Sequence, residues 1–144
     1  MIRSYRKPWR ALILCLLLCL VICFCGCSGS GAGSAQQKEP YVHVDGPTAA
    51  EMIETGEYLL VDVRTEIPFN MGHIPGAINL PYDTVSADPD EPVELLPDKS
   101  QPLIIYCEYG GSSKEVAEKL AAKGYTDITE FDGLLVWEGE LETS

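Results

Sequence analysis

The chain has 144 residues, a formal net charge of −12 and a hydrophobic content of 46%. This length allows one hydrophobic core beyond the N-terminal stretch and excludes two domains. All 22 acidic residues follow that stretch, so an acidic surface is expected, which excludes nucleic acid and anionic lipid as binding partners by charge repulsion.

The N-terminal residues have the pattern of a targeting segment. A basic start is followed by an apolar run over residues 11–24, shorter than the about 20 residues of a membrane span and typical of a signal peptide. The next residues, Cys25-Gly26-Cys27, resemble the lipobox of bacterial lipoproteins, in which the Cys after a small residue is lipidated. We therefore expect a signal peptide over residues 1–26 and lipid attachment at Cys27, with an uncleaved anchor or ordinary secretion as alternatives.

Residues 27–40 are expected to form the lipid-attachment site and a flexible linker, because Gly, Ser, Ala and Gln cannot build a core. The folded domain is then residues 41–144. Each alternative for the leader places this domain on the extracytoplasmic side of a cell membrane, since the basic flank stays inside. The resemblance implies a lipid-anchored protein of the bacterial cell envelope.

Within the domain, strand and helix patterns alternate. The expected strands are residues 41–44, 58–63, 77–80, 103–106 and 126–131. The expected helices are residues 48–55, 113–122 and 134–138. This alternation is typical of an α/β fold in which a central parallel sheet has helices on both faces and binds its ligand at the carboxyl ends of the strands.

Two segments have weaker patterns. Residues 67–72 are compatible with more than one structure, and residues 88–102 form a connection rich in Pro and acidic residues, with one helical turn expected at 93–96.

The lone cysteine of the domain, Cys107, ends the apolar run at residues 103–106. Gly110 and Gly111 follow it, and a predicted helix then begins at the serines. Backbone N–H groups of such a loop can surround the sulfur, and the helix N-terminus favours the thiolate over the thiol. A thiolate is a nucleophile, so Cys107 is a candidate catalytic residue; the alternative is an inert buried cysteine.

Four stretches together resemble the rhodanese family, in which a Cys carries sulfane sulfur as a persulfide. They are Cys107-Glu108-Tyr109-Gly110-Gly111-Ser112-Ser113, Asp62-Val63-Arg64, Gly72-His73-Ile74-Pro75-Gly76-Ala77, and Asp132-Gly133-Leu134 with Trp137. The resemblance implies a rhodanese-like α/β fold over residues 41–142 and sulfurtransferase activity without a cofactor or metal. Its implied partners are a sulfur donor and a thiol acceptor.

The resemblance also assigns roles within the loop. Cys107 would be catalytic, and the substrate would be bound by Glu108, Tyr109, Gly110, Gly111, Ser112 and Ser113. Many family members have Arg where Ser112 stands, and that Arg assists anionic donors such as thiosulfate. With Ser112 there and Glu108 beside the thiol, we expect persulfide donors of low charge to be preferred.

Two other kinds of enzyme are disfavoured. Phosphatases and arsenate reductases with related Cys loops need an Arg at the position of Ser113 to bind the oxyanion. A thiol-redox role lacks a resolving cysteine, because the other five of the six cysteines lie in the leader and at Cys27. The remaining alternative is a rhodanese-fold binding module without turnover that docks an envelope partner.

The other conspicuous side chains are expected to be structural. Asp62 and Arg64 are predicted to form an ion pair at the end of a strand, and His73 to hydrogen-bond the turn shaped by Pro75 and Gly76. Trp137 is predicted in the core. With His43 and His73 the only histidines and no pair of closely spaced cysteines in the domain, no metal site is expected.

Overall fold

The computed structural model describes residues 40–144, which lie in one compact unit, Lys38–Ser144. The predicted signal peptide, the lipid attachment at Cys27 and nearly all of the linker fall on residues 1–39, outside the described part. Within the described part, no helix is both long and apolar enough to cross a bilayer.

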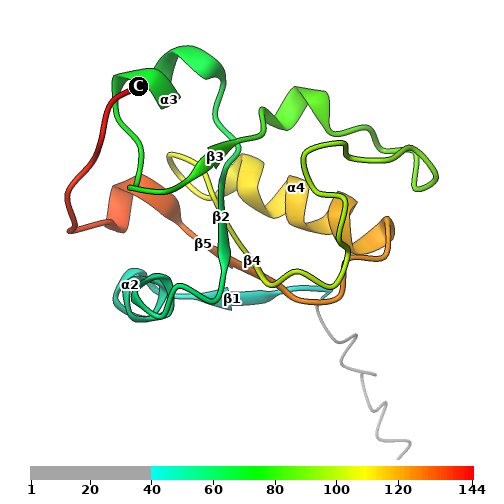
Figure 1. Cartoon of the computed structure of the whole chain (residues 1–144), viewed down its shortest axis with the longest axis horizontal. Helices are drawn as coiled ribbons and strands as arrows, with labels where there is room; N and C mark the ends of the chain where they lie inside the picture. Colours follow the sequence, from blue (N-terminus) through cyan, green and yellow to red (C-terminus); the bar gives the residue numbers. More distant parts are fainter. Residues whose placement is uncertain (1–39) are drawn as a thin grey trace, which may run out of the picture. The chain divides into compact units, whose positions relative to one another are not determined.

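The fold is built on a five-stranded sheet in the order β1-β5-β4-β2-β3, and every neighbouring pair is parallel (Figure 1). The strands are β1 (Val42–Val44), β2 (Leu59–Asp62), β3 (Ile78–Asn79), β4 (Leu103–Tyr106) and β5 (Ile128–Phe131). The helices are α2 (Gly46–Glu54), α3 (Glu66–Met71) and α4 (Gly111–Ala122), with 3-10 turns η1 (Tyr82–Thr84) and η2 (Gly133–Val136). The predicted α/β fold with a central parallel sheet is confirmed.

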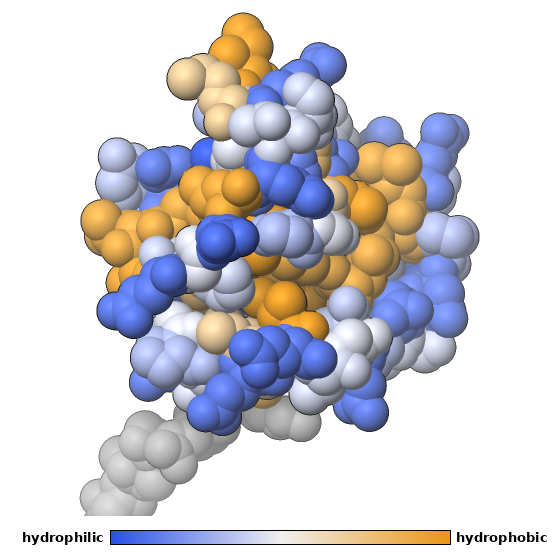
Figure 2. Space-filling model, turned by 60° about the vertical axis from the view of Figure 1, so that its left-hand side comes forward, coloured by the Kyte–Doolittle hydropathy of each residue, from blue (hydrophilic) through white to orange (hydrophobic). Residues whose placement is uncertain are grey.

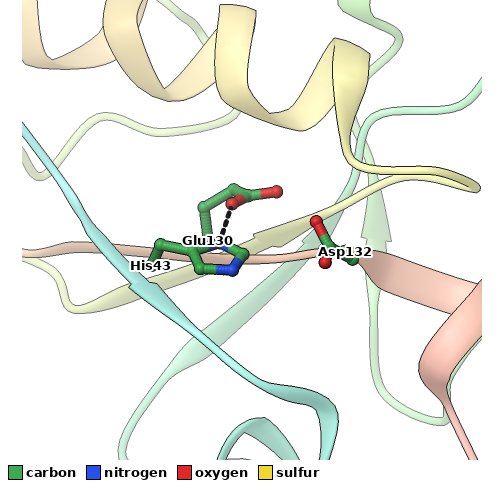
Figure 3. A group of neighbouring side chains, drawn as sticks. All are labelled: His43, Glu130 and Asp132. Carbon is green, nitrogen blue, oxygen red and sulfur yellow. Dashed lines mark hydrogen bonds and ion pairs between the residues drawn. The ribbon is translucent and has the colours of Figure 1, made fainter.

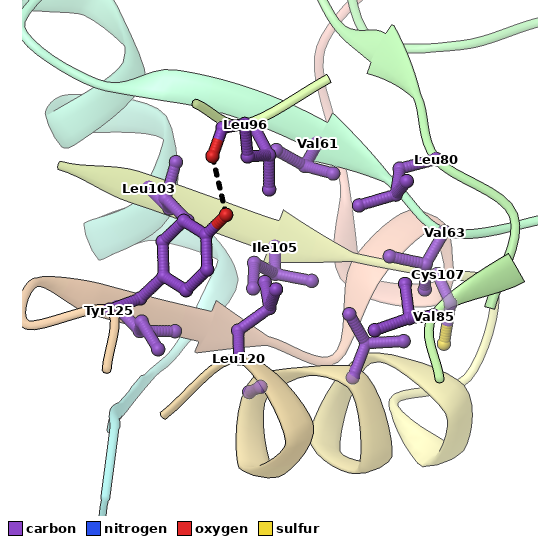
Figure 4. Packing of buried hydrophobic residues seen from close by; sticks show 13 residues of the cluster. Val61, Val63, Leu80, Val85, Leu96, Leu103, Ile105, Cys107, Leu120 and Tyr125 are labelled. Atoms are coloured by element: carbon purple, nitrogen blue, oxygen red, sulfur yellow. Dashed lines mark hydrogen bonds between the residues drawn. The ribbon is translucent and has the colours of Figure 1, made fainter. Parts of the chain in front are cut away.

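Strand β4 lies in the middle of the sheet because all four of its residues are apolar enough to be buried on both faces. Leu103 and Ile105 belong to the cluster on the α4 face, whereas Ile104 and Tyr106 belong to the cluster on the α2 face. Cys107 continues this alternation, so its side chain joins the α4 cluster at the end of β4 (Figure 4). Because successive side chains of a strand point to opposite faces, the position of Cys107 directly after Tyr106 places its thiol on the α4 face.

Most predicted elements are present, with shifted ends. Helix α2 begins earlier than expected because Asp45 acts as its N-cap, accepting a hydrogen bond from the Thr48 N–H at 2.9 Å. The ambiguous residues 67–72 belong mostly to α3. At 93–96, where one helical turn is expected, Leu96 N–H donates to Val93 O at 3.0 Å, which closes a single turn that does not extend into a helix. The last predicted helix is the 3-10 turn η2.

Candidate active site

A pocket of about 540 Å³ opens at the carboxyl end of the sheet, and Cys107 is among its lining residues. Its walls come from the segments that follow β4, β2 and β3, which lie next to one another in the sheet. Parallel strands end at the same edge, so the residues after them converge there. The pocket lining includes Arg64, Glu108, Tyr109, Gly111 and Ser112. The sequence-predicted loop therefore faces a space that can hold a small ligand.

The sulfur of Cys107 is nearly buried, since the residue is 5% exposed. The Gly110 N–H donates a hydrogen bond to Sγ at 3.1 Å, and this is the one backbone donor to the sulfur among the described residues. Gly110 has a φ of +84°, and a Cβ there would lie 2.7 Å from Oδ1 of Asp132. Glycine at this position thus lets the loop turn its N–H toward the sulfur before α4 begins.

Ser113 lies on the buried side of the sulfur and is fully buried. Its Oγ is 3.5 Å from Sγ and donates a hydrogen bond to Oε1 of Glu130 at 2.6 Å. The other oxygen of Glu130, Oε2, is 2.7 Å from Nδ1 of His43 (Figure 3). Of the predicted substrate-binding residues, Glu108, Tyr109, Gly111 and Ser112 thus line the pocket. Gly110 and Ser113 instead contact the sulfur.

Sequence reasoning missed Glu130 and His43, which are linked to the thiol through Ser113. Glu130 lies in the strand pattern Ile-Thr-Glu-Phe, at a position that shares a face with Ile128 and is fully buried. An acidic residue at a core-facing position of a predicted strand is the signal that points to it. His43 lies directly opposite in the register of β1 and β5, which pairs His43 with Glu130.

Arg64 forms the predicted ion pair with Asp62. Its Nη2 lies 2.7 Å from Oδ2 of Asp62, and its Nε donates to both carboxylate oxygens at 3.1 and 3.0 Å. Burial alone lowers the pKa of Arg64, but the hydrogen bonds and charge of Asp62 outweigh it and raise that pKa above its ordinary value. Nη1 also lies 3.2 Å from Oε2 of Glu108, so the guanidinium links the pair to the Cys loop.

The other predicted structural residues differ in detail from expectation. His73 is buried, but its Nδ1 lies 3.0 Å from Phe69 O in α3 rather than at the turn near Pro75, so the expected partner is wrong. Its ring stacks on Phe69 with 3.8 Å between the ring centroids. Trp137 packs at the margin of the α2-face core against Phe131 and is partly buried. Tyr109 is 73% exposed and is among the residues that line the pocket at Cys107.

A group of possible metal ligands comprises His43, Glu130 and Asp132, whose donor atoms lie within 4.8 Å of one another. Two of the three are already engaged with each other, since His43 Nδ1 contacts Glu130. The third, Asp132, pairs with the Lys114 ammonium at 3.1 Å, so a protein cation lies next to the group. The contacts present are those of a hydrogen-bonded cluster.

A second pocket of about 340 Å³ lies between α2 and the C-terminal segment. It is lined by apolar side chains such as Pro47, Ile53 and Trp137, with Glu54 and Glu138 among its charged residues. Figure 2 shows this side of the molecule, where apolar patches alternate with polar residues. No cysteine, histidine, serine or lysine is among its described lining residues, so the pocket at Cys107 is the better candidate for chemistry.

Comparison with known proteins shows the family of the chain. Residues 47–137 match the family model of the rhodanese-like domain. The chain is 30% identical over 93 residues to the thiosulfate sulfurtransferase GlpE of Shewanella oneidensis, which covers 65% of this chain and 87% of that protein. It is also 28% identical to a solved structure described as rhodanese with anions from E. coli, with a TM-score of 0.52, covering 60% of this chain and 99% of that one.

A third relative is much longer. The chain is 30% identical over 91 residues to the adenylyltransferase and sulfurtransferase UBA4 of Candida albicans, which covers 60% of this chain and 21% of that protein. The chain thus spans about a fifth of the length of this relative. The match to the family model extends over most of the domain, from the first turn of α2 to Trp137. The chain belongs to the rhodanese-like domain family.

Proposed function

We propose that this domain is a sulfurtransferase in which Cys107 carries a sulfane sulfur as a persulfide. The observation that carries the proposal is the position of Sγ: it lies at the wall of the pocket and accepts the Gly110 N–H at 3.1 Å. That hydrogen bond stabilises a negatively charged sulfur more than a neutral one. The thiosulfate sulfurtransferase activity named for GlpE supports the same chemistry.

The reaction has two halves. The Cys107 thiolate attacks the outer sulfur of a donor, a new S–S bond forms, and the donor leaves with the electron pair of the bond that breaks. The donor leaves as sulfite from thiosulfate or as a thiolate from a persulfide. An acceptor thiolate then attacks the outer sulfur of the Cys107 persulfide, and Cys107 leaves as a thiolate.

The charges around the pocket favour a donor of low charge. Arg64 is the cation of the pocket lining, and it is paired with both Asp62 and Glu108. Ser112 adds no charge where many relatives have Arg. A dianion such as thiosulfate would therefore meet a guanidinium whose charge is already offset by two carboxylates, whereas a persulfide donor of low charge depends less on a free cation.

Mass spectrometry of the purified domain tests the proposal directly. After exposure to an alkyl persulfide, the protein is expected to gain the mass of one sulfur atom on the peptide that contains Cys107, and thiosulfate at equal concentration is expected to give less. The Cys107→Ser variant, with its melting temperature unchanged within a few degrees, should gain none. A folded wild type that gains no sulfur from either donor would instead support the alternative of a binding module that docks an envelope partner.

We further propose that a signal peptide over residues 1–26 and a lipid on Cys27 hold the domain at the extracytoplasmic face of a cell membrane. The support is the order of features in the sequence: basic residues, an apolar run over residues 11–24, and a cysteine directly after Gly26. A lipidated cysteine that carries two or more acyl chains anchors a protein stably in the membrane, whereas a single acyl chain binds only marginally.

Metabolic labelling with a fatty-acid analogue in a bacterial host tests this anchor. The wild type is expected to be labelled and to enter the detergent phase on phase separation, whereas Cys27→Ser should lose the label. Cys25→Ser is the matched control, because it changes a neighbouring cysteine to a small residue of the kind usual there, and it should keep the label. Labelling that survives Cys27→Ser would contradict the proposal.

A further inference from the structure

We infer that Glu130 accepts the proton of the Cys107 thiol through the hydroxyl of Ser113, and that His43 holds Glu130 from the surface side. For its role in turnover this inference rests on the proposed sulfur transfer. The proton transfer itself concerns the free thiol and can be measured without any sulfur donor.

The four side chains form an unbroken chain of contacts from the sulfur to the surface (Figure 3 shows the outer two). The distances are 3.5 Å from Sγ to Ser113 Oγ, 2.6 Å from Oγ to Glu130 Oε1, and 2.7 Å from Glu130 Oε2 to His43 Nδ1. Glu130 is fully buried, whereas the side chain of His43 is 47% exposed. The chain therefore leads from a buried thiol to solvent.

The fold fixes these contacts from separate elements. Cys107 follows β4, Ser113 lies in the first turn of α4, Glu130 is in β5 and His43 is in β1. Side chains paired in a parallel register lie on the same face, and the register of β1 and β5 pairs His43 with Glu130. Ile128 of β5 lies in the α4-face cluster together with Cys107, and Glu130 shares the face of Ile128.

A buried carboxylate at this position needs an explanation beyond packing. Burying an ionised group costs far more free energy than burying an apolar side chain of similar size, unless it is fully hydrogen-bonded. Both oxygens of Glu130 are bonded, one to Ser113 and one to His43, so the position is built for a carboxylate. One of the two partners is the hydroxyl that contacts the sulfur, which connects the carboxylate to the thiol.

The directions of the hydrogen bonds show how the proton can move. In the thiol form, Cys107 S–H donates to Ser113 Oγ, and the Ser113 hydroxyl donates to the Glu130 carboxylate. When the thiol proton passes to Oγ and the hydroxyl proton passes to Oε1, Glu130 becomes a neutral carboxylic acid that donates to Ser113. Ser113 O–H then donates to the thiolate, together with the Gly110 N–H.

This transfer conserves charge within the buried group. The negative charge leaves Glu130 and appears on the sulfur, so no additional charge is created in the core. The proton stays on Glu130 while Cys107 carries the persulfide and returns when the acceptor takes the outer sulfur and Cys107 is released as a thiolate. His43 donates its Nδ1 proton to Oε2, because a carboxylate oxygen can only accept.

Three other titratable groups lie near Glu130: Lys114 in α4, Asp132 directly after β5, and Tyr41 directly before β1. Lys114 and Asp132 pair with each other at 3.1 Å, so their charges offset one another. The hydrogen bond that the Lys114 ammonium donates to Asp132 is the main cause that raises the pKa of Lys114, and the charges of Glu130 and Tyr41 contribute in the same direction. Lys114 therefore stays charged at neutral pH.

The experiment uses residues 27–144 with Cys27→Ser, so that Cys107 is the only cysteine. It measures, as a function of pH, the rate at which neutral iodoacetamide alkylates Cys107. Two groups that share one proton titrate in two steps, so the rate is expected to rise, reach a plateau and rise again. Glu130→Gln should give a single rise and, at the pH of the plateau, a rate lower by about tenfold. Ser113→Ala should do the same, because it interrupts the chain while Glu130 remains.

Glu118→Gln is the matched control, since it removes an exposed carboxylate from α4 and should keep the two-step profile. Circular dichroism melting of each variant shows that it is folded. If Glu130→Gln and Ser113→Ala keep the plateau at the wild-type rate, the inference is overturned. A protein that shows the expected profiles yet gains no sulfur in mass spectrometry would reject the proposed function and leave the proton transfer standing.

Discussion

Gly133→Ala is expected to lower the free energy of unfolding by more than about 3 kcal/mol and to abolish sulfur transfer. Gly133 has a φ of +76°, and a Cβ there would lie 1.9 Å from the carbonyl oxygen of Cys107 and 2.7 Å from its carbonyl carbon. Those are backbone atoms at the end of the central strand, so they cannot turn away as a side chain can. The substitution would push the Cys107 loop out of place.

The next residues after Gly133 strengthen this expectation. Leu134 N–H donates to Cys107 O at 3.0 Å, and Leu135 N–H donates to Glu108 O at 3.1 Å. The start of η2 thus supports the backbone of the Cys107 loop through two hydrogen bonds. A displacement of η2 breaks both of them.

Gly76→Ala is the matched control for Gly133→Ala. Gly76 has a φ of +81°, but no atom lies within 4 Å of a Cβ built there. It should therefore cost only the strain of a left-handed alanine, about 1–2 kcal/mol, and leave sulfur transfer unchanged. Urea denaturation of both variants measures the difference. If Gly133→Ala and Gly76→Ala lower the free energy of unfolding equally, the close approach of Gly133 to Cys107 does not cause the destabilisation.

Arg64→Ala is expected to destabilise the domain by about 3 kcal/mol, because it leaves Asp62 buried without its cation. Asp62 is fully buried and the Arg64 side chain is only 9% exposed. The guanidinium also donates to Gly72 O at 2.7 Å, which ties the end of β2 to the segment after α3. Since the pKa of Arg64 is raised, the guanidinium stays charged at every pH at which the fold can be assayed.

A double substitution separates the charge effect from the loss of contacts. Asp62→Asn combined with Arg64→Ala removes both charges, so it should be more stable than Arg64→Ala alone when both are unfolded in urea. If the double variant is no more stable, the buried charge is not the cause. If Arg64→Ala keeps its stability but loses sulfur transfer, Arg64 acts on the substrate instead of on the fold.

The sequence was sufficient for the fold and for the position of the thiol because local patterns determine both. The apolar run of β4 and the helix signal after Gly111 place Cys107 at a strand end, whatever the rest of the chain does. The pair Asp62 and Arg64 was likewise predictable, since the two residues flank one strand end.

The contacts of Glu130 with Ser113 and His43 were not predictable from local patterns. His43 and Glu130 are far apart in the chain, and they meet only because β1 adds to the sheet beside β5 in one register. The partner of His73 was also missed, because it depends on residues 67–72 forming α3, where the pattern is too short to favour a helix. In both cases tertiary structure decides the partner.

The position of β1 at the edge of the sheet makes the contact between His43 and Glu130 depend on that edge. β1 is a three-residue strand at the edge of the sheet and pairs with β5 alone. Short edge strands open at a much lower free energy than a central strand such as β4. When β1 separates from β5, Glu130 loses its contact with His43, whereas β4, the strand that Cys107 follows, stays paired on both sides. The lifetime of this pairing thus sets how long Glu130 keeps its partner at the surface.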